Sequence, residues 1–528
     1  MSALAIGGIA FVCALAALPA VIWIARRFDI VDHPAHRKIH QAPVPFLGGV
    51  AVFFGIVVAL AGSFALTPAI ETSKILAIAA VGLLGMLIGL LDDRYQLRPR
   101  HKLCLQIAVL FAFTCLGYRL DFLRLPGLEA FNLHVFSYPV TLFWMLALVN
   151  GMNLIDGVDG LAGSVVFTML AMTAAVAAGV KDTATVAICF AGMGAVLAFL
   201  LLNWRPARIY LGDAGSTGLG MLMTAALVAL GTNQPPLVLR TSAQAPLTEP
   251  FQFQLPAMTL LALYPALEVS LSVLRRLLRG KAIGSADRAH IHHKLLNAGW
   301  GPARICVSAA GTAVMGGFVV LTSLGESRGI AAWVLLAVGL WIGFLLHYCG
   351  YLQSIHPENV RDIRPHFLVA NYFANMQRVK LELAHSVSEV LGLVQQACVE
   401  FNVQSLRLTI DGSKANRENV VHDWTHPKAD KYAETGTLKR DQVLGEESGS
   451  SAEWHFLPRV IEEDIDVEHR VLMHGFMLKA LQRADVLFAA SGTYEKVQPA
   501  VPDASVLSSG SLRARARQDS PADAAAGQ

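Results

Sequence analysis

Long apolar runs, separated by short polar stretches, fill the first two thirds of the chain. Each run is about 20 residues long, which is the length that an α-helix needs to cross the hydrocarbon core of a bilayer. The expected spans are residues 3–24, 48–67, 75–91, 104–120, 135–149, 162–179, 184–202, 215–231, 255–274, 303–323 and 330–350. The pattern therefore predicts an all-α polytopic membrane domain of about 11 transmembrane helices over residues 1–351.

The pattern changes beyond residue 356, where charged and apolar residues mix and no spanning run occurs. We expect a small soluble α+β domain over residues 356–490, with helices at 379–401 and 467–487, a strand at 405–410 and a turn at 445–451. No motif in this domain is typical of catalysis. The Ser-, Ala-, Asp- and Arg-rich stretch 498–528 is expected to be a disordered tail.

The composition is consistent with the bilayer as solvent, since 54% of the residues are hydrophobic and 15% are charged, against about 25% charged in soluble domains. The formal net charge of +3 is too small to predict nucleic-acid binding. The seven cysteines show no metal-ligand spacing and are expected to be packing residues.

Basic residues are concentrated in the loops on one side of the predicted helix bundle. That side carries sixteen Lys and Arg residues, against six on the opposite side. Because basic loops tend to remain in the cytoplasm, we expect the N-terminus outside and the C-terminus in the cytoplasm. Every motif described below lies on the expected cytoplasmic side.

Two adjacent carboxylates, Asp92 and Asp93, stand where the third predicted span meets water, and Lys102 follows ten residues after Asp92. Adjacent carboxylates repel each other unless a cation lies close by. A divalent metal, or a phosphate chemistry that needs a base beside a metal ligand, would explain their placement. A hydrated helix end is the alternative.

A second polar motif follows the fifth predicted span, with the sequence Asn150-Gly-Met-Asn153-Leu-Ile-Asp156-Gly-Val-Asp159. If the segment is helical, its polar side chains share one face, and its glycines let a ligand approach the backbone. An Asx-rich turn between two helices is the alternative. Two Asn and two Asp residues in register favour a binding site.

A third motif, Tyr210-Leu-Gly212-Asp213-Ala-Gly215-Ser216, leads directly into the eighth predicted span. Asp213 or Ser216 could serve simply as the N-cap of that helix. A carboxylate and free N–H groups at a helix start also suit Mg²⁺ together with a phosphate ligand. Tyr210 could then offer a flat face to a base.

A fourth motif, Asp287-Arg288-Ala-His290-Ile-His292-His293-Lys294, lies in a long basic loop. Three histidines suggest zinc, but no cysteine or spaced partner completes a tetrahedral site. The basic side chains are instead typical of an anion-binding loop suited to a pyrophosphate. Solvated charge alone is the alternative.

The first predicted cytoplasmic loop contains Asp32-His-Pro34-Ala-His36-Arg37-Lys38-Ile-His40 and, further on, Pro43-Val-Pro45-Phe-Leu-Gly48-Gly49. Its prolines and glycines predict a shaped entry into the second span, and its basic residues add positive charge near the headgroups. A topology signal of the positive-inside kind is the alternative.

These five motifs, in this order, resemble those of the polyprenyl-phosphate N-acetylhexosamine-1-phosphate transferases (glycosyltransferase family 4). The resemblance covers about residues 1–350. The form His290-Ile-His292-His293 resembles the bacterial undecaprenyl-phosphate GlcNAc-1-phosphate transferase branch rather than the branch that transfers phospho-MurNAc-pentapeptide. The soluble domain departs from the short tails expected of that branch.

The resemblance implies roles for individual residues. Asp213 would be a principal ligand of Mg²⁺, with Mn²⁺ as an alternative ion, and Asp156 would also contribute to the metal site. Asp92 would act on the lipid phosphate as its base or orienter, with support from Asp93. The expected substrate-binding residues are Lys102, Asn153, Asp156 and Asp159 around the nucleotide sugar, Tyr210 on uracil, and Arg288, His290, His292 and His293 on the pyrophosphate.

The implied reaction transfers N-acetylhexosamine-1-phosphate, with GlcNAc-1-phosphate as the expected group, from a UDP-sugar to undecaprenyl phosphate and releases UMP. It would initiate cell-surface polysaccharide synthesis at the cytoplasmic face of the bacterial inner membrane. Direct attack by the lipid phosphate and a covalent aspartyl intermediate are both compatible with these residues. Direct attack is favoured, because the acceptor phosphate is already an anionic nucleophile.

A secondary transporter is the alternative function, because acids at the membrane edge often mark ion pathways. The expected partners of the transferase are a UDP-sugar, undecaprenyl phosphate and membrane lipid, and not nucleic acid. The sequence leaves open a homodimer, and the docking of downstream glycosyltransferases on the C-terminal domain.

Overall fold

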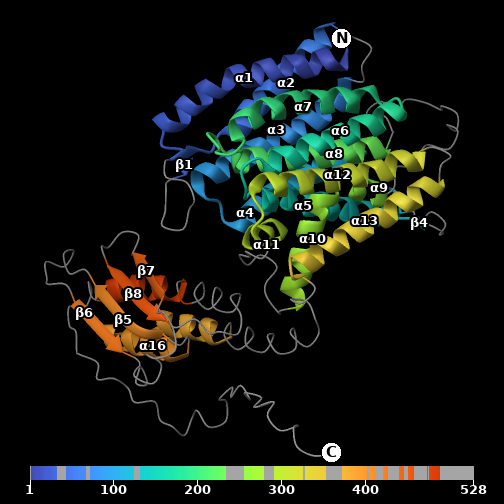
Figure 1. Ribbon diagram of the computed structural model, residues 1–528. Helices are drawn as coiled ribbons and strands as arrows, with labels where there is room; N and C mark the ends of the chain where they lie inside the picture. The colour runs from blue at the N-terminus through green and yellow to red at the C-terminus, as the bar shows by residue number, and fades with distance from the viewer. Residues whose placement is uncertain are drawn as a thin grey trace, which may run out of the picture. The chain divides into compact units, whose positions relative to one another are not determined.

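The chain divides into two compact units, Met1–Arg361 and Asp362–Gln528 (Figure 1). The computed structural model describes residues 2–32, 43–66, 72–123, 131–232, 255–278, 290–324, 328–351, 372–400, 403–410, 420–425, 439–444, 450–456, 473 and 475–487.

The first unit is a bundle of helices. They are α1 (Ala3–Arg27), α2 (Gly48–Leu66), α3 (Thr72–Tyr95), α4 (Pro99–Cys115), α5 (Ser137–Ile155), α6 (Leu161–Gly179), α7 (Thr183–Asn203), α8 (Gly212–Thr232), α9 (Leu255–Leu261), α10 (Leu263–Leu278), α11 (Ile291–Asn297), α12 (Pro302–Leu324) and α13 (Arg328–Tyr348). Two short antiparallel strand pairs lie in its loops, β1 (Val31–Asp32) with β2 (Val44–Pro45), and β3 (Phe122–Leu123) with β4 (Phe131–Asn132). Helices suit this apolar sequence because every backbone group must find its partner within the chain when no water is near.

Helix α8 lies inside the first unit. Its residues from Ala214 to Leu230 are all buried, as expected of a helix that is apolar on every side. Helices α2, α3 and α5 pack against it, and Figure 1 shows it among the other helices of the bundle. Helix α13 instead exposes Trp333 and Leu340, which suits a lipid-facing surface.

The expected number of spans is not confirmed, although each expected span coincides with helical residues. Within the described residues, the helices that are long and apolar enough to cross a bilayer number eight: α1, α3, α5 with the turn before it, α6, α7, α8, α12 and α13. The bent pair α9 and α10 would make nine. The first unit is therefore a multi-pass membrane domain.

The span expected at residues 255–274 is bent. Helices α9 and α10 meet at a bend of 101°, next to Ala262. Pro265 has no N–H to donate to the carbonyl of Leu261, so one helical hydrogen bond is missing at the bend. The chain therefore changes direction before it reaches Glu268 of α10.

A buried ion pair fastens the start of α3 to the start of α7. The ammonium nitrogen of Lys74 lies 2.6 Å from Oδ2 of Asp182, and both side chains are almost fully buried. Asp182 also accepts hydrogen bonds from the backbone N–H and the hydroxyl of Thr185. These bonds and the ion pair offset the free-energy cost of burying the carboxylate, which would be high if its charge were unpaired.

Tyr351 fastens the end of the first unit to α10. Its hydroxyl accepts a hydrogen bond from Nη1 of Arg275 at 2.5 Å and donates one to the carbonyl of Leu271 at 2.7 Å. The ammonium of Lys294, on α11, lies 5.4 Å from the centre of its ring. Tyr351, three residues after the end of α13, thus contacts both α10 and α11.

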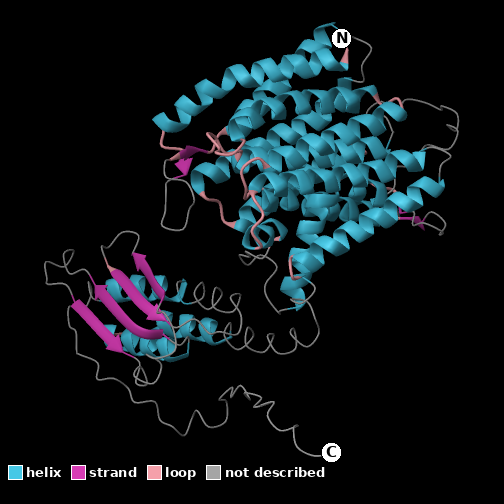
Figure 2. Cartoon of the chain, in the orientation of Figure 1, coloured by secondary structure: helices cyan, strands magenta, loops and turns pink. Residues whose placement is uncertain are grey.

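The second unit is a four-stranded antiparallel sheet with helices on one face (Figure 2). The strands β5 (Val403–Ile410), β6 (Val420–Thr425), β7 (Lys439–Leu444) and β8 (Ser451–Phe456) have the order β6-β5-β8-β7. Helices over residues 372–383 and 475–487, with α16 (Val387–Glu400), pack on the sheet. The helix expected at 379–401 is thus two helices, and the expected strand 405–410 lies within β5. The disordered tail expected at 498–528 lies outside the described residues.

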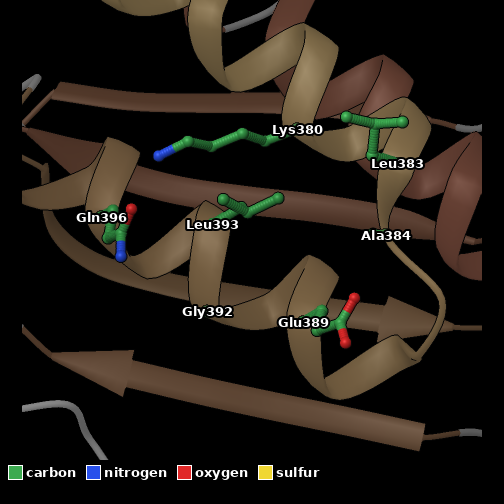
Figure 3. A pocket seen from close by; sticks show the side chains of 7 residues that line it. All are labelled: Lys380, Leu383, Ala384, Glu389, Gly392, Leu393 and Gln396. Carbon is green, nitrogen blue, oxygen red and sulfur yellow. The ribbon is translucent and has the colours of Figure 1, made fainter.

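A groove of about 340 Å³ lies on the helical side of this unit. Leu383 and Leu393 line its centre, with Lys380 on the first helix and Glu389 on α16 at its edge (Figure 3). The groove contains none of the motifs singled out in the sequence.

We predict that the first unit folds without the second, provided that Tyr351 is kept. A chain that ends after Arg361 should unfold at the temperature at which the first unit of the full-length protein unfolds. Adding Tyr351→Phe to that chain should lower its free energy of unfolding by about 1–3 kcal/mol, because the hydroxyl that bonds to Arg275 and to the carbonyl of Leu271 is lost. Thermal unfolding in detergent, followed by tryptophan fluorescence, measures both effects. The matched control is Tyr348→Phe, at a partly exposed tyrosine, and equal losses from the two substitutions would contradict the role given to Tyr351.

Candidate active site

Lys102 joins two carboxylates from different helices at one end of the first unit. Its ammonium nitrogen lies 2.7 Å from Oδ2 of Asp92, near the end of α3, and 3.0 Å from Oδ1 of Asp213, in the first turn of α8. The side chains of Asp92 and Lys102 are 12% and 15% exposed, whereas that of Asp213 is 39% exposed. Of these three residues, Asp213 is therefore the one that a ligand reaches most readily.

Asp93 caps the helix on which Asp213 lies. Its Oδ1 accepts the backbone N–H of Asp213 and its Oδ2 accepts that of Ala214, both at 2.9 Å. The first N–H groups of a helix have no partner within the helix, and here α3 supplies one from outside. The alternative that Asp213 or Ser216 is merely the N-cap is therefore wrong. Gly212, at φ +74°, makes the left-handed turn that leads into α8.

The contact between α3 and α8 requires a glycine. A Cβ atom added to Gly89, one turn before Asp93, would overlap the carbonyl oxygen of Asp213 and the backbone nitrogen of Ala214. No other residue permits this approach of the two backbones. The position of Asp213 is thus set by Gly89 and Asp93 of α3.

The Asn150–Asp159 motif is helical in its first half only. Helix α5 ends at Ile155, and Asp156 is its C-cap residue. Asn153, on α5, lies within 3.3 Å of the Thr217 hydroxyl of α8, whereas Asn150 bonds back to its own helix. Asp159 lies in the turn that follows and accepts the N–H of Ala207 at 3.2 Å. The helical interpretation is thus correct up to Ile155, and the turn interpretation is correct for the residues from Asp156 to Asp159.

Asp156 lies within electrostatic reach of the carboxylates on α3 and α8. Burial, together with the negative charges of Asp213 and Asp93, raises the pKa of Asp156 to about 7. A bound cation would favour its ionised form.

Tyr210 connects the base of the first loop to this site. Its N–H donates to the carbonyl of Pro45 at 2.7 Å, and its own carbonyl accepts the N–H of Gly48 at 2.9 Å. Burial, with the charges of Asp159 and Asp32, raises the pKa of Tyr210 to about 12. The phenol therefore stays neutral near the Asp156–Asp159 turn.

The histidine motif stands at the start of α11. The rings of His290 and His292 are stacked with their centroids 5.6 Å apart, and His293 lies 4.3 Å from His292. A Cβ atom on Gly157 would lie 2.9 Å from Nε2 of His292. The histidine motif therefore touches the turn that carries Asp156 and Asp159.

The sequence analysis missed two residues that hold these motifs together. Glu268 of α10 is 1% exposed and lies against His290 and His292. Asn203 accepts the N–H of Gly160 and donates to the carbonyl of Ile209, and so ties two loops of the site. A lone acid within an apolar run is the signal that would have found Glu268, but Asn203 carries no comparable signal.

Other expected residues lie outside the described part of the chain. They are Arg288 and Asp287 of the fourth motif, and residues 33–42 of the first loop, which include Arg37, Lys38 and His40. Their contributions stay predictions.

Comparisons with known proteins place this geometry in a family. The family model described as glycosyl transferase family 4 matches residues 75–231. A Bacillus subtilis protein, a probable undecaprenyl-phosphate N-acetylglucosaminyl 1-phosphate transferase, is 30% identical over 329 residues, which are 62% of this chain and 83% of that protein. The chain belongs to glycosyl transferase family 4. The resemblance drawn from the five motifs is thereby confirmed.

Two further relatives support this membership. The undecaprenyl-phosphate α-N-acetylglucosaminyl 1-phosphate transferase of Escherichia coli K12 is 30% identical over 336 residues, 62% of this chain and 85% of that protein. The decaprenyl-phosphate N-acetylglucosaminephosphotransferase of Mycolicibacterium smegmatis is 31% identical over 293 residues, 52% of this chain and 71% of that protein.

The family match includes the carboxylate cluster. The matched residues run from α3 to α8 and so contain Asp92, Asp93, Lys102, Asp156 and Asp213. The histidine motif and Glu268 lie beyond the matched residues. In this family 4 member, the two regions meet at Gly157 and His292.

The donor atoms of the site suit a hard divalent cation. Mg²⁺ binds through one or two carboxylates, with phosphate oxygens and waters completing its octahedron. Among the described residues, no group of three or more His, Cys, Asp or Glu side chains is arranged as a metal cage, but Mg²⁺ does not require one. Asp213 and Asp156 are the carboxylates that could supply the oxygens, and the pKa of Asp156 is raised by burial and by the negative charges of Asp213 and Asp93, which a cation would offset.

We predict that Gly89→Ala destabilises the family 4 domain by about 1–3 kcal/mol, because the new methyl group overlaps the backbone of α8. Thermal unfolding in detergent measures the loss. Gly62→Ala in α2 is the control, since a Cβ atom there meets no atom within 4 Å, and alanine favours a helix over glycine. Equal stability of the two variants would contradict the close contact of α3 with α8.

Proposed function

We propose that this protein transfers GlcNAc-1-phosphate from UDP-GlcNAc to undecaprenyl phosphate and releases UMP, as the initiating step of cell-surface polysaccharide synthesis. The observation that carries the proposal is the convergence of Asp92, Lys102 and Asp213, from three helices, at one end of a multi-pass membrane domain. Relatives named for this reaction on undecaprenyl phosphate share about 30% of the aligned residues.

The charges at the site match the needs of the reaction. A sugar nucleotide brings two phosphoryl groups and a lipid phosphate brings a third, so the protein must offset their repulsion. Lys102 supplies one positive charge between Asp92 and Asp213. His290, His292 and His293 add imidazole groups beside the Asp156–Asp159 turn.

The reaction proceeds by direct attack. An oxygen of the lipid phosphate forms a bond to the phosphorus that carries the sugar. The bond from that phosphorus to the oxygen shared with the uridine-bearing phosphate breaks, and UMP leaves with the electron pair. Asp92, close to Lys102, orients the acceptor phosphate. Asp93 supports the same site, with one of its oxygens bonded to the backbone N–H of Asp213 and the other to that of Ala214.

Asp213 and Asp156 would hold Mg²⁺, with Mn²⁺ as an alternative. The ion would neutralise the negative charge that develops on the phosphoryl oxygens. Asn153, held by Thr217, and Asp159 shape the pocket for the nucleotide sugar, and Tyr210 lies beside it for the uracil.

The site faces the cytoplasm of a bacterial inner membrane in this proposal. The support is the excess of Lys and Arg in the loops at the end of the bundle that carries Asp92, Lys102 and Asp213. UDP-sugars are made in the cytoplasm, so this orientation gives the enzyme access to its donor.

The transporter alternative has no support. Transporters place their acids near the middle of the membrane, in broken helices. Asp92 and Asp213 instead lie at helix ends. A homodimer, and the docking of downstream glycosyltransferases on the second unit, remain proposals.

We predict that Asp213→Asn lowers kcat for UMP release by about 100-fold or more, because it removes a charge at the position where phosphoryl charge must be neutralised. The assay uses the purified full-length protein in detergent with UDP-GlcNAc, undecaprenyl phosphate and Mg²⁺. Asp121→Asn is the matched control, since Asp121 pairs with Arg119 beyond the far end of α4. Near-normal activity of Asp213→Asn would remove Asp213 from the site.

We also predict that removal of divalent ions with EDTA abolishes UMP release. Both proposed ligands, Asp213 and Asp156, are carboxylates, and among the described residues only Lys102 forms an ion pair with either of them. A cation is therefore needed to neutralise their charge. Excess Mg²⁺ or Mn²⁺ should restore the activity. Release that continues unchanged in EDTA would refute the metal requirement and leave the transfer reaction itself standing.

A further inference from the structure

Glu268 is a buried carboxylate that contacts the histidine motif. It lies on α10, three residues after Pro265, and is 1% exposed. Its Oε1 lies 3.3 Å from Nδ1 of His292, and its Oε2 lies 3.5 Å from Nδ1 of His290. Oε2 also accepts the N–H of Ile291 at 3.3 Å. One buried carboxylate therefore contacts the histidine motif at three consecutive residues.

The carboxylate decides which nitrogen of His292 carries a proton. An ionised carboxylate only accepts hydrogen bonds, so Nδ1 of His292 must be protonated to bond to Glu268. The opposite nitrogen, Nε2, is buried and has no hydrogen-bond partner among the described residues. It faces Gly157 at the Asp156–Asp159 turn. Buried polar atoms normally have partners, so Nε2 of His292 is aimed at a ligand.

A phosphoryl ligand requires a second proton on the ring. Oxygens of a doubly ionised pyrophosphate accept hydrogen bonds and do not donate them, so Nε2 must donate. A ring that donates from both nitrogens is the imidazolium. The negative charge of Glu268, at 3.3 Å, stabilises that cation.

We propose that Glu268 is a positioning residue, which orients His292 and keeps both of its ring nitrogens protonated, so that Nε2 donates to a phosphoryl oxygen of the sugar nucleotide beside Gly157. The proposal rests on the function proposed above. Glu268 acts through His292 and does not itself contact the sugar nucleotide.

Several other titratable groups surround His292, and each must be considered in a pH profile. His290, His293 and Lys294 lie on its own segment, and Asp156 is next to Gly157. Tyr264 on α10 and Cys349 after α13 interact with Glu268, and Cys306 on α12 with Tyr264. Glu268 is the carboxylate that contacts Nδ1, among the described residues. Its removal should therefore change the ring charge more than any other single substitution.

The test compares Glu268→Gln with the wild type in full-length protein. Glutamine keeps the shape and can accept from Nδ1, but it carries no charge. At pH 8 the KM for UDP-GlcNAc should rise about tenfold, because the uncharged amide no longer stabilises the imidazolium, and a neutral ring that keeps its proton on Nδ1 cannot donate from Nε2. At pH 6 the rise in KM should be smaller, because a higher proton concentration favours the imidazolium.

Two further variants separate positioning from a structural role. Glu268→Asp keeps the charge and should keep the wild-type pH profile, even if kcat falls. Adding Glu268→Gln to His292→Gln should raise KM no further, because the two residues act as one unit. If Glu268→Gln does not fold, the comparison of the wild type with Glu268→Asp and His292→Gln still decides. KM should then stay unchanged from pH 6 to pH 8 in the wild type and in Glu268→Asp and be raised at both pH values in His292→Gln, and a KM that rises over this range in the wild type would contradict a ring that the carboxylate keeps doubly protonated.

The proposal is overturned if Glu268→Gln raises KM equally at pH 6 and pH 8, or if its effect adds fully to that of His292→Gln. Calorimetric titration with UDP-GlcNAc alone gives the same comparison without turnover. Absence of UMP release from the wild type would refute the proposed reaction, whereas pH-dependent binding of UDP-GlcNAc that requires Glu268 would still support the positioning role.

Discussion

The contact between the end of α3 and the start of α8 is the constraint on which the rest of the site depends. At this point two helix backbones approach so closely that Gly89 leaves room for nothing but hydrogen. Asp93 then bonds to two N–H groups at the start of α8. The free N–H groups at a helix start would otherwise bind water or an anionic ligand. Because Asp93 already occupies two of these N–H groups, a ligand at this point would interact with the side chain of Asp213 and not with the end of the helix.

Because of this constraint, two adjacent acids have different roles. Asp92 and Asp93 are neighbours in sequence but point to different partners, Asp92 to Lys102 and Leu97, and Asp93 to the backbone of α8. The same division recurs at the histidine motif. There, Glu268 is buried behind the rings, and the face of His292 opposite to it is turned toward Gly157. In both places one carboxylate fixes a neighbouring group, the start of α8 for Asp93 and the ring of His292 for Glu268.

The sequence alone predicted the membrane domain and most members of the site, because both leave strong local signals. Apolar runs of sufficient length identify spanning helices, and polar residues at the ends of such runs, like Asp92 and Asp213, stand out against them. The bend at Pro265 was missed because an apolar run shows length but not direction. The cap that Asp93 makes on α8 was not predicted, since only the packing of α3 on α8 shows it. Glu268 and Asn203 were missed because their partners are distant in sequence.

The ion pair between Lys74 and Asp182 affects how α3 responds to the thickness of the surrounding bilayer. Lys74 and Asp92 lie eighteen residues apart on one helix, which corresponds to about 27 Å along its axis. Both ends are held, one by Asp182 and the other by Lys102 and α8. This distance is close to the hydrocarbon thickness of a typical bilayer, about 30 Å. Helix α3 therefore cannot slide or tilt independently when the bilayer becomes thicker or thinner. Hydrophobic mismatch must be absorbed by outer helices such as α13, or by the lipid itself, while the acids at the end of α3 keep a constant depth.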